Sequence, residues 1–518
     1  MELVKKNIHM NKIKCATVMQ MTLDDDFNVP DVKPDVEKII REQAQIKLND
    51  YKLINQKLMV SGVMEFNVLY ISSEDGRLIH SLDGKIPFED VVNMENAQAD
   101  DMVKISYTLD DLTATMVNSR KISIRSIISF DCIAENVYDE EAAVEIIDDE
   151  SEGIESISKN VTVTQIAVNK KDIYRIREDV ALPSSKQNIM EILYSDTSVS
   201  GVETRLEDGG VNLKGELQLF VMYTSENGDT QFLEKDIPFS GMVEVDGCNA
   251  DMIDDIRIVM TSKDLSVKAD TDGEERILVL EAVLSLDMKL YEEEDITMIK
   301  DFYSTKKNLT PIITEGYYDN ILLKNNSKVR VTDRVKVDEK EPIVLQLCNS
   351  SAVLRIDDMV IVDDGINVEG VVDISLMYVT NDDMVPVNSI NGLIPFSQQI
   401  EVKGIKEDCI YSIRPSIEHC SVMMSDGREF EVKVSISLEA IVFDRRKENV
   451  IREYSIEDIV PQEDDVSMIG YVVRENDNLW ELAKRYRTTR ECIKTMNFME
   501  KEDVEPGDRI LIVKDAVM

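Results

Sequence analysis

The chain has 518 residues, of which 43% are hydrophobic, and its 101 acidic and 58 basic residues give a net charge of −43. Such a composition can bury hydrophobic cores in three or four domains, and the negative charge argues against nucleic acid and anionic lipid surfaces as partners. Residues 470–514 differ from the rest, because they hold nine basic and nine acidic residues and carry no net charge. The negative charge of the chain therefore lies outside this segment, mainly in residues 1–469, which we call the body.

The sequence also indicates the cellular compartment of the protein. It has no run of 18 apolar residues, and its first 14 residues contain lysines without a following apolar stretch. We therefore expect neither a transmembrane helix nor a secretory signal. The seven cysteines are scattered without C-x-x-C spacing, which is typical of reduced thiols buried as small hydrophobic residues. These features together predict a cytoplasmic protein.

One sequence pattern occurs three times in the body. Each copy has a Gly, a Tyr eight residues later, and an Ile-Pro-Phe tripeptide 14 or 16 residues after the Tyr. The copies are Gly62, Tyr70 and residues 86–88, then Gly215, Tyr223 and residues 237–239, then Gly370, Tyr378 and residues 394–396. The tripeptide recurs at intervals of 151 and 157 residues, which indicates internal duplication.

Apolar and polar residues alternate around each of these glycines. The alternating segments are residues 58–70, 213–223 and 368–378, and a second set follows at residues 122–130, 278–286 and 430–438. A period of two with one polar face predicts antiparallel sheets. The fold class that we expect is mainly β, with three tandem antiparallel β-sandwich-like domains.

Acidic stretches suggest the limits of the copies. We predict repeats over residues 1–138, 154–291 and 302–446, an acidic linker over 447–469, and a C-terminal domain over 470–514. Ahead of the first two glycines, residues 30–40 and 183–193 carry apolar side chains at i, i+3 and i+4. This spacing predicts a short helix in each copy.

The C-terminal segment is predicted to form a short strand, two short helices and a closing strand. Asn478 is placed to cap the first helix, with Glu481 three residues later, and Thr488 or Thr489 is placed to cap the second. The residues expected in the small core are Leu479, Leu482, Ala483, Tyr486, Ile493 and Met496. A different face of the first helix carries the chain's single Trp.

That face contains Trp480, Lys484 and Arg487 at positions i, i+4 and i+7. Two interpretations remain open for Trp480. It is either packed in the core, or it is a partly exposed aromatic flanked by cations, which is a residue type that anchors protein interfaces.

This segment resembles a LysM domain, a small βααβ module that usually binds N-acetylglucosamine-containing glycans. The triple repeat resembles the SPOCS domain of spore-coat proteins. Together they resemble the spore-coat morphogenetic proteins of the SipL/SpoVID type. The resemblance implies a non-enzymatic scaffold in the mother-cell cytoplasm at the forespore surface, whose LysM domain binds the coat-basement ATPase, stage IV sporulation protein A. It also implies that the repeats recruit other coat proteins or self-associate.

The LysM-like segment departs from the family pattern in its loops. Residues 476–478 replace the usual Gly-Asp-Thr, Arg487 replaces a Gly between the helices, and residues 497–499 replace the usual Asn-Asn-Leu. Glycan grooves in LysM domains are formed by the loop before the first helix and the loop after the second. Larger apolar groups there favour a protein partner over a sugar.

We therefore predict a partner-binding surface on this segment. Its residues are Asn476, Asp477, Asn478, Trp480, Lys484, Arg487, Asn497, Phe498 and Met499. The alternative is a cell-wall-associated protein that binds peptidoglycan or N-acetylglucosamine.

The rest of the sequence gives little sign of catalysis. It lacks the nucleotide-binding, serine-hydrolase and zinc-protease motifs. One alternative is a metal site at His419 and Cys420, with Cys409 eleven residues before Cys420. Adjacent strand residues point to opposite faces, however, and Cys420 aligns with the apolar Leu112 of the first copy. We expect no catalytic residue, no cofactor and no metal.

Overall fold

The computed structural model describes residues 1–72, 78–147, 152–457 and 468–513. Within these residues three units of six strands precede one small α+β domain. The first unit contains β1 (Glu2–Asn28), β2 (Lys38–Ile54), β3 (Lys57–Ile71), β4 (Ile79–Asn93), β5 (Met102–Asn118) and β6 (Lys121–Ile147). The second contains β7 (Ile154–Ala181), β8 (Ile189–Glu207), β9 (Gly210–Ser225), β10 (Thr230–Glu244), β11 (Ile253–Ala269) and β12 (Glu275–Ser304). The third contains β13 (Asn308–Lys336), β14 (Val344–Val362), β15 (Gly365–Thr380), β16 (Val387–Glu401), β17 (Ile410–Asp426) and β18 (Glu429–Glu457).

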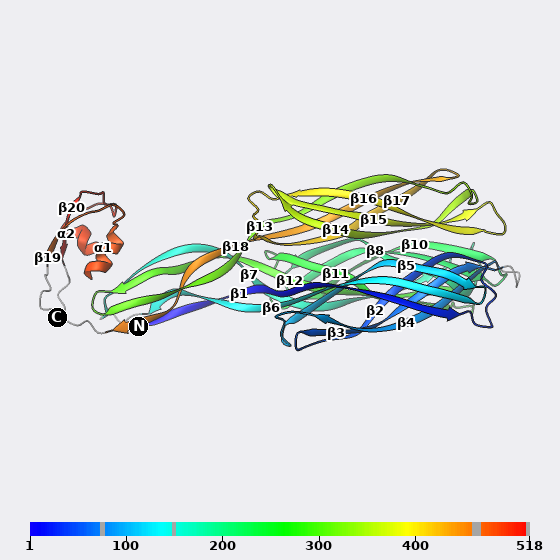
Figure 1. The fold of residues 1–518 in the computed structure, drawn as a ribbon, viewed down its shortest axis with the longest axis horizontal. Coiled ribbons are helices and arrows are strands. Elements are labelled where there is room, and N and C mark those ends of the chain that lie inside the picture. Colours follow the sequence, from blue (N-terminus) through cyan, green and yellow to red (C-terminus); the bar gives the residue numbers. More distant parts are fainter. Residues whose placement is uncertain (73–77, 148–151, 458–467, 514–518) are drawn as a thin grey trace.

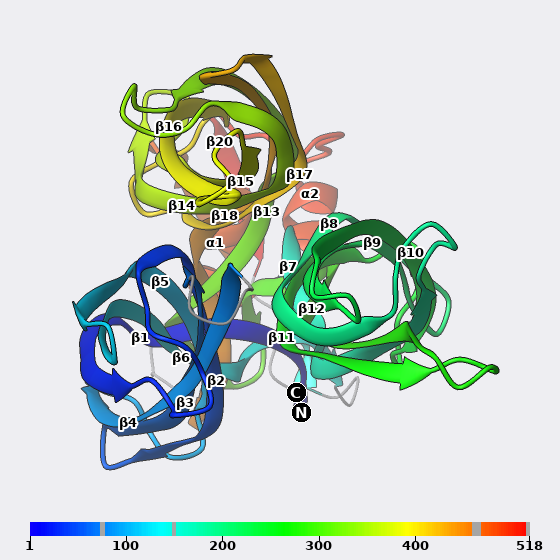
Figure 2. The same ribbon diagram turned by 90° about the vertical axis from the view of Figure 1, so that its right-hand side faces the viewer.

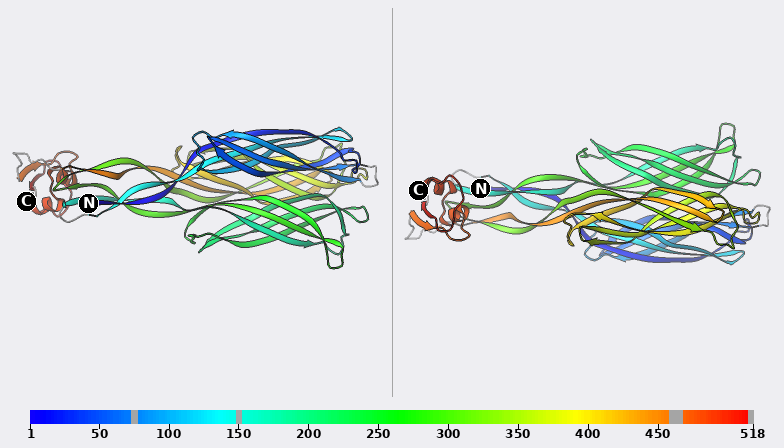
Figure 3. Two further views of the ribbon diagram at one scale, coloured as in Figure 1. Left: turned by 90° about the horizontal axis from the view of Figure 1, so that it is seen from below. Right: turned by 90° about the horizontal axis from the view of Figure 1, so that it is seen from above.

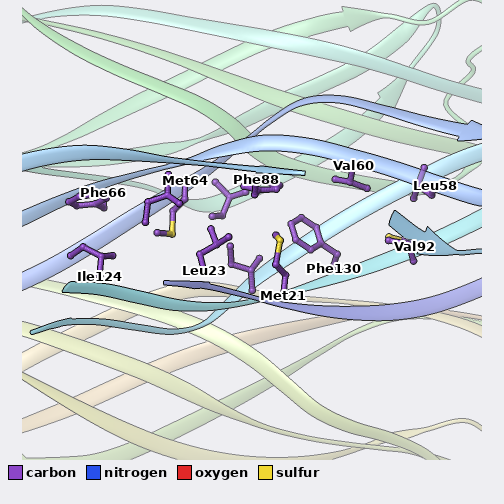
Figure 4. Packing of buried hydrophobic residues seen from close by; sticks show 14 of the residues in the cluster. Met21, Leu23, Leu58, Val60, Met64, Phe66, Phe88, Val92, Ile124 and Phe130 are labelled. Carbon is purple, nitrogen blue, oxygen red and sulfur yellow. The ribbon is translucent and has the colours of Figure 1, made fainter. Parts of the chain in front are cut away.

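Each unit is a sandwich of two three-stranded antiparallel sheets. In the first unit the strand orders are β1-β6-β5 and β2-β3-β4, and the other units repeat them with their own strands. One hydrophobic cluster fills the space between the two sheets of each unit. Figure 4 shows part of the first cluster, in which Leu23, Phe66 and Phe130 come from three different strands. The predicted antiparallel sandwich-like repeats are confirmed.

The repeated glycines and phenylalanines are cross-strand partners. Gly62 pairs with Phe88, Gly215 with Phe239 and Gly370 with Phe396. A Cβ atom at Gly62 would lie 2.5 Å from the ring of Phe88. In each unit the aromatic ring lies over a glycine that leaves room for it, a known way of stabilising glycine inside a sheet.

The segment between the first two strands of each unit is not helical. After Val29 the chain makes a turn and enters β2 at Lys38. The guanidinium group of Arg120 donates to the carbonyl oxygens of Val29, Pro30 and Lys33 at 2.8–3.0 Å. The predicted short helix is therefore wrong here, because a side chain binds carbonyl groups that a helix would bind with its own N–H groups.

The short helix predicted in the second unit is also wrong, for the same reason. Residues 183–188 form a turn before β8, and Arg276 donates to the carbonyl oxygen of Pro183 at 3.0 Å. In the third unit Arg428 donates to the carbonyl oxygens of Asp338 and Glu341. The arginine that holds this turn is thus part of the repeat.

The three units lie side by side around a common axis, as Figure 2 shows. A hydrophobic cluster at this axis takes residues from all three units, including Leu69, Tyr194, Met222 and Met377. Arg41, which is 8% exposed, donates from Nε to the Tyr194 hydroxyl at 2.8 Å and from an Nη atom to Ser351 Oγ at 3.0 Å. One side chain of the first unit therefore binds both other units.

The long first and last strands of each unit continue beyond the sandwich as two-stranded ribbons, and the three ribbons pack together into what we call the stalk (Figures 1 and 3). The stalk consists of residues 2–13 with 135–147, 154–166 with 291–304, and 308–321 with 443–457. Ile8, Val163, Met298, Tyr318 and Val450 share one buried cluster along it. A single hydrophobic core thus joins the three ribbons.

Buried charges join neighbouring units at the base of the stalk. Glu135, which is 2% exposed, accepts from Lys289 at 2.6 Å, and Lys104 pairs with Glu135 and with Asp287. The charges of Lys289 and Lys104 outweigh burial and hold the pKa of Glu135 below its usual value.

The acidic stretches that we expected at the repeat limits lie largely in the stalk. Residues 139–147 belong to β6, residues 292–301 belong to β12, and residues 447–457 of the expected linker belong to β18. Residues 458–467 of that linker are outside the described residues. The repeat limits themselves stay a prediction.

The C-terminal domain has the predicted βααβ order. It consists of β19 (Met468–Val472), α1 (Leu479–Tyr486), α2 (Arg490–Met496) and β20 (Arg509–Val513). The strands β19 and β20 pair antiparallel, and Figure 1 shows the domain beyond the end of the stalk, where the N-terminus also lies.

Candidate functional site

The two helices of the C-terminal domain begin and end as their sequences indicate. Asn478 Oδ1 accepts from the Glu481 N–H at 2.8 Å, and Thr489 Oγ1 accepts from the Cys492 N–H at 3.0 Å. Arg487 follows α1 with a φ of 53°, in the left-handed region that a glycine usually occupies. Both predicted caps are confirmed, the second with Thr489 rather than Thr488.

The core of the domain is small. Leu479, Leu482, Ala483 and Ile493 are buried as predicted, whereas Met496 is 46% exposed and its predicted burial is wrong. The physical reason lies in the next residue, whose side chain occupies the position against β20. Asn497 Nδ2 donates to the carbonyl oxygen of Leu511 and Asn497 Oδ1 accepts from its N–H, both at 2.7 Å.

Three of the predicted binding residues shape the loops of the domain. Asn478 caps α1 and Asn497 ties α2 to β20. Asp477 Oδ2 accepts from the Tyr471 hydroxyl at 2.7 Å and from the Arg474 N–H at 2.9 Å. These hydrogen bonds, that of Tyr471 above all, lower the pKa of Asp477. The three side chains fix the loop geometry, whatever they contact outside the domain.

Two other predicted residues point into solvent. Phe498 is 94% exposed and has a φ of 55°, and Asn476 is exposed with a φ of 70°. A positive φ is uncommon for an aromatic residue and costs of order 1–3 kcal/mol. The loop after α2 therefore presents a bare aromatic side chain at an energetic cost to the domain.

Trp480 and Lys484 do not point into solvent, because they contact the end of the stalk. Trp480 is 8% exposed, and its Nε1 donates to Asp301 Oδ2 at 2.8 Å. The ammonium group of Lys484 lies 2.7 Å from both carboxylate oxygens of Asp301. The Trp480 ring also meets the ring of Tyr303 edge to face, with centroids 5.0 Å apart. Of the two interpretations, core packing is confirmed and partial exposure is wrong: Trp480 is buried, in a cluster that the domain shares with Tyr303 of the stalk.

Two further groups complete this contact. The Tyr303 hydroxyl donates to the carbonyl oxygen of Thr488 at 2.8 Å, and burial raises the pKa of Tyr303. The guanidinium group of Arg490 lies over the Trp480 ring, 5.3 Å from its centroid. Sequence reasoning missed Asp301 and Tyr303, which lie about 180 residues before the helix that they contact.

The body offers little that could act as a nucleophile or hold a metal. Burial raises the pKa of Cys132 to about 11, of Cys348 to about 12 and of Cys420 to about 11. Cys420 packs against the core of the third unit, as the alignment with an apolar residue predicts. In the described part of the chain no cluster of three or more His, Cys, Asp or Glu side chains has the arrangement of a metal site, and neither helix has the length and apolar surface to cross a bilayer.

Comparison with known families agrees with this architecture. The model of the SipL SPOCS domain matches residues 35–117, 188–269 and 344–425, and the LysM domain model matches residues 471–513. No curated protein and no solved structure matches the chain. The chain is therefore a SPOCS-domain protein with a terminal LysM domain. Three SPOCS domains followed by one LysM domain match the SipL-type architecture that the sequence resembles.

The family match covers only part of each unit. In the first unit it runs from just before β2 to the end of β5, and the other two matches cover the corresponding strands. The long strands that build the stalk lie outside all three matches. Both families are non-catalytic domain families, which agrees with the predicted absence of enzyme activity.

Proposed function

We propose that the chain is a non-enzymatic scaffold of spore-coat assembly. It acts in the mother-cell cytoplasm at the forespore surface, and its LysM domain binds stage IV sporulation protein A, the coat-basement ATPase. The observation that carries the proposal is the combination of three SPOCS domains in one three-fold body with a LysM domain at the far end of the stalk.

The binding surface in this proposal is the predicted set on the LysM domain. Phe498 supports a protein partner over a sugar, because a fully exposed aromatic side chain is a common anchor of protein interfaces. The SPOCS domains are left free to bind other coat proteins or further copies of the chain.

Capture of purified stage IV sporulation protein A tests the proposal. We expect the full chain to bind it, a chain ending at residue 469 to lose binding, and Phe498→Ala to weaken binding about tenfold or more, as loss of an interface anchor does. Arg509→Ala is the control, since Arg509 is exposed on β20 of the same domain and is outside the predicted set. Binding retained without the LysM domain would contradict the proposal. So would binding unchanged by Trp480→Ala combined with Lys484→Glu.

A second function is kept because of the LysM match itself, since LysM domains usually bind glycans. Binding to peptidoglycan or N-acetylglucosamine would use the loops that contain Asn476 and Phe498. Co-sedimentation of the full chain with purified peptidoglycan, together with no capture of the ATPase, would favour this alternative.

A further inference from the structure

The end of the stalk is built to receive one face of the LysM domain. The face consists of Trp480 and Lys484 on α1 and the carbonyl group of Thr488 just after it, and it meets Asp301 and Tyr303 of β12. Ile157 of β7 packs against the same cluster. We call this the α1–stalk contact. Its core excludes water, since Tyr303 is 3% and Trp480 is 8% exposed.

A β-bulge accompanies the position of Asp301 on the stalk. The register of β12 against β7 shifts between Ile299 and Asp301, so that Lys300 is an extra residue. Bulges bend a strand and re-aim its side chains. The ribbons of the first and third units have a bulge at the same place, next to Glu145 in β6 and next to Glu453 in β18. The carboxylate after the bulge is therefore part of the repeat.

Only the second unit follows this carboxylate with an aromatic residue two positions later. Tyr303 stands where the first unit has Ile147 and the third has Ser455, counted from the bulge. Glu145 and Glu453 are both exposed. The pair of a carboxylate and an aromatic ring thus distinguishes one ribbon among three, and that ribbon holds the LysM domain.

We propose that the α1–stalk contact is an intramolecular interaction that competes with the external partner of the LysM domain. This inference rests on the proposed function, since Trp480 and Lys484 belong to the predicted partner-binding set. In the docked form both side chains contact the chain's own Asp301, so a partner that uses them binds only after the domain has left the stalk.

The covalent connection makes the docked form easy to reach. Ten residues separate the end of β18 from the start of β19, so the domain cannot move far from its docking site. A short tether raises the effective concentration of two linked surfaces to the millimolar range. A modest contact is therefore enough to keep the domain docked. A partner then binds with an apparent Kd that is larger by one over the fraction of undocked domain.

Trp480 reports directly on this contact, because it is the only Trp in the chain. We would excite it selectively in the full chain and record its emission maximum and its quenching by acrylamide. The test variant is Asp301→Arg, which removes the acceptor of Trp480 and repels Lys484. The matched controls are Glu145→Arg and Glu453→Arg, which make the same kind of charge reversal at the equivalent bulges of the other two ribbons.

The expected result is a red-shifted and more strongly quenched Trp480 in Asp301→Arg alone, with both controls like the parent chain. Asp301→Arg should also capture stage IV sporulation protein A more tightly than the parent chain. Unchanged fluorescence in Asp301→Arg, or an equal change in the controls, would refute the formation of the α1–stalk contact. Release of Trp480 with capture equal to that of the parent would overturn the competition. Release of Trp480 with no capture by any chain would refute the proposed function and leave the contact established.

Discussion

Substitution of the repeated glycines by alanine tests whether the Gly–Phe pairs hold the sandwiches together. At Gly370 a new Cβ atom would lie 2.2 Å from the carbonyl oxygen of Arg355 and 3.0 Å from the ring of Phe396. Real Cβ atoms essentially never come that close to a backbone atom, so β14 and β15 must move apart. Overpacking of this kind costs about 1–3 kcal/mol. For a unit of this size we expect the Tm to fall by roughly 4–8 °C for about 2 kcal/mol.

The expected loss of stability differs among the other glycines, because their Cβ atoms would meet different groups. At Gly62 the closest atoms are again a backbone oxygen, that of Lys47, and a ring atom of Phe88, both at 2.5 Å. At Gly215 the closest atoms belong to the side chain of Phe239, at 2.7 Å. A side chain can yield where a backbone cannot, so Gly215→Ala should cost less than the other two. Gly470→Ala is the neutral control, because no atom lies within 4 Å of its Cβ position.

Thermal unfolding followed by far-ultraviolet circular dichroism measures the series, since the signal comes mainly from the strands of the body. A second substitution sharpens the test. Phe239→Leu should recover part of the stability lost in Gly215→Ala, whereas Phe396→Leu should recover little in Gly370→Ala, because the contact with the backbone oxygen remains. Gly370→Ala as stable as Gly470→Ala would refute the reasoning.

Three further predictions concern the axis and the buried charges. Arg41→Ala should lower the free energy of unfolding by about 1–3 kcal/mol, because it leaves the Tyr194 hydroxyl buried without its donor, and denaturant titration measures this. Glu135→Gln should destabilise by about 3 kcal/mol at neutral pH, because Lys289 loses its buried counter-ion. The lowered pKa of Glu135 makes its contribution present above about pH 4.5 and lost as the pH falls through the folded value, so unfolding curves of the two chains should converge in acid. Burial raises the pKa of Glu42, so the ionised carboxylate destabilises the folded protein as the pH rises above 4.5. Glu42→Gln should therefore raise the free energy of unfolding at neutral pH but not in acid.

The sequence predicted well those features that depend on local pattern. The alternation of apolar residues identified the strands, and Asn478 and Thr489 identified the starts of the two helices. It failed where a distant side chain decides the local conformation. The turn after Val29 looked like a helix by spacing, and only the guanidinium group of Arg120, about 90 residues away, explains why it is not one.

The packing of the three units around one axis was also not predicted, although a signal was present. In an antiparallel strand with one solvent-exposed face, apolar and polar residues should alternate to the end of the strand. Residues 68–71 and 219–223, however, are apolar without interruption. In the structure Tyr70 faces the core of its own unit while Leu69 faces the axis cluster. A break in the alternation at the same place in successive copies thus marks a second buried face.

The residues at the axis also explain why the three copies form one chain with a fixed order. Arg41, Tyr194 and Asn349 pair with Leu69, Met222 and Met377, so they occupy the same register position in the three units. All three are buried, but they are an arginine, a tyrosine and an asparagine. Three identical copies would bring three like side chains together, and three arginines would repel one another without a counter-ion. A tandem chain allows each copy to differ, so that the donor of the first unit meets the acceptor of the second. The duplicated cores thus set the fold of each unit, while divergence at the axis sets which unit lies beside which.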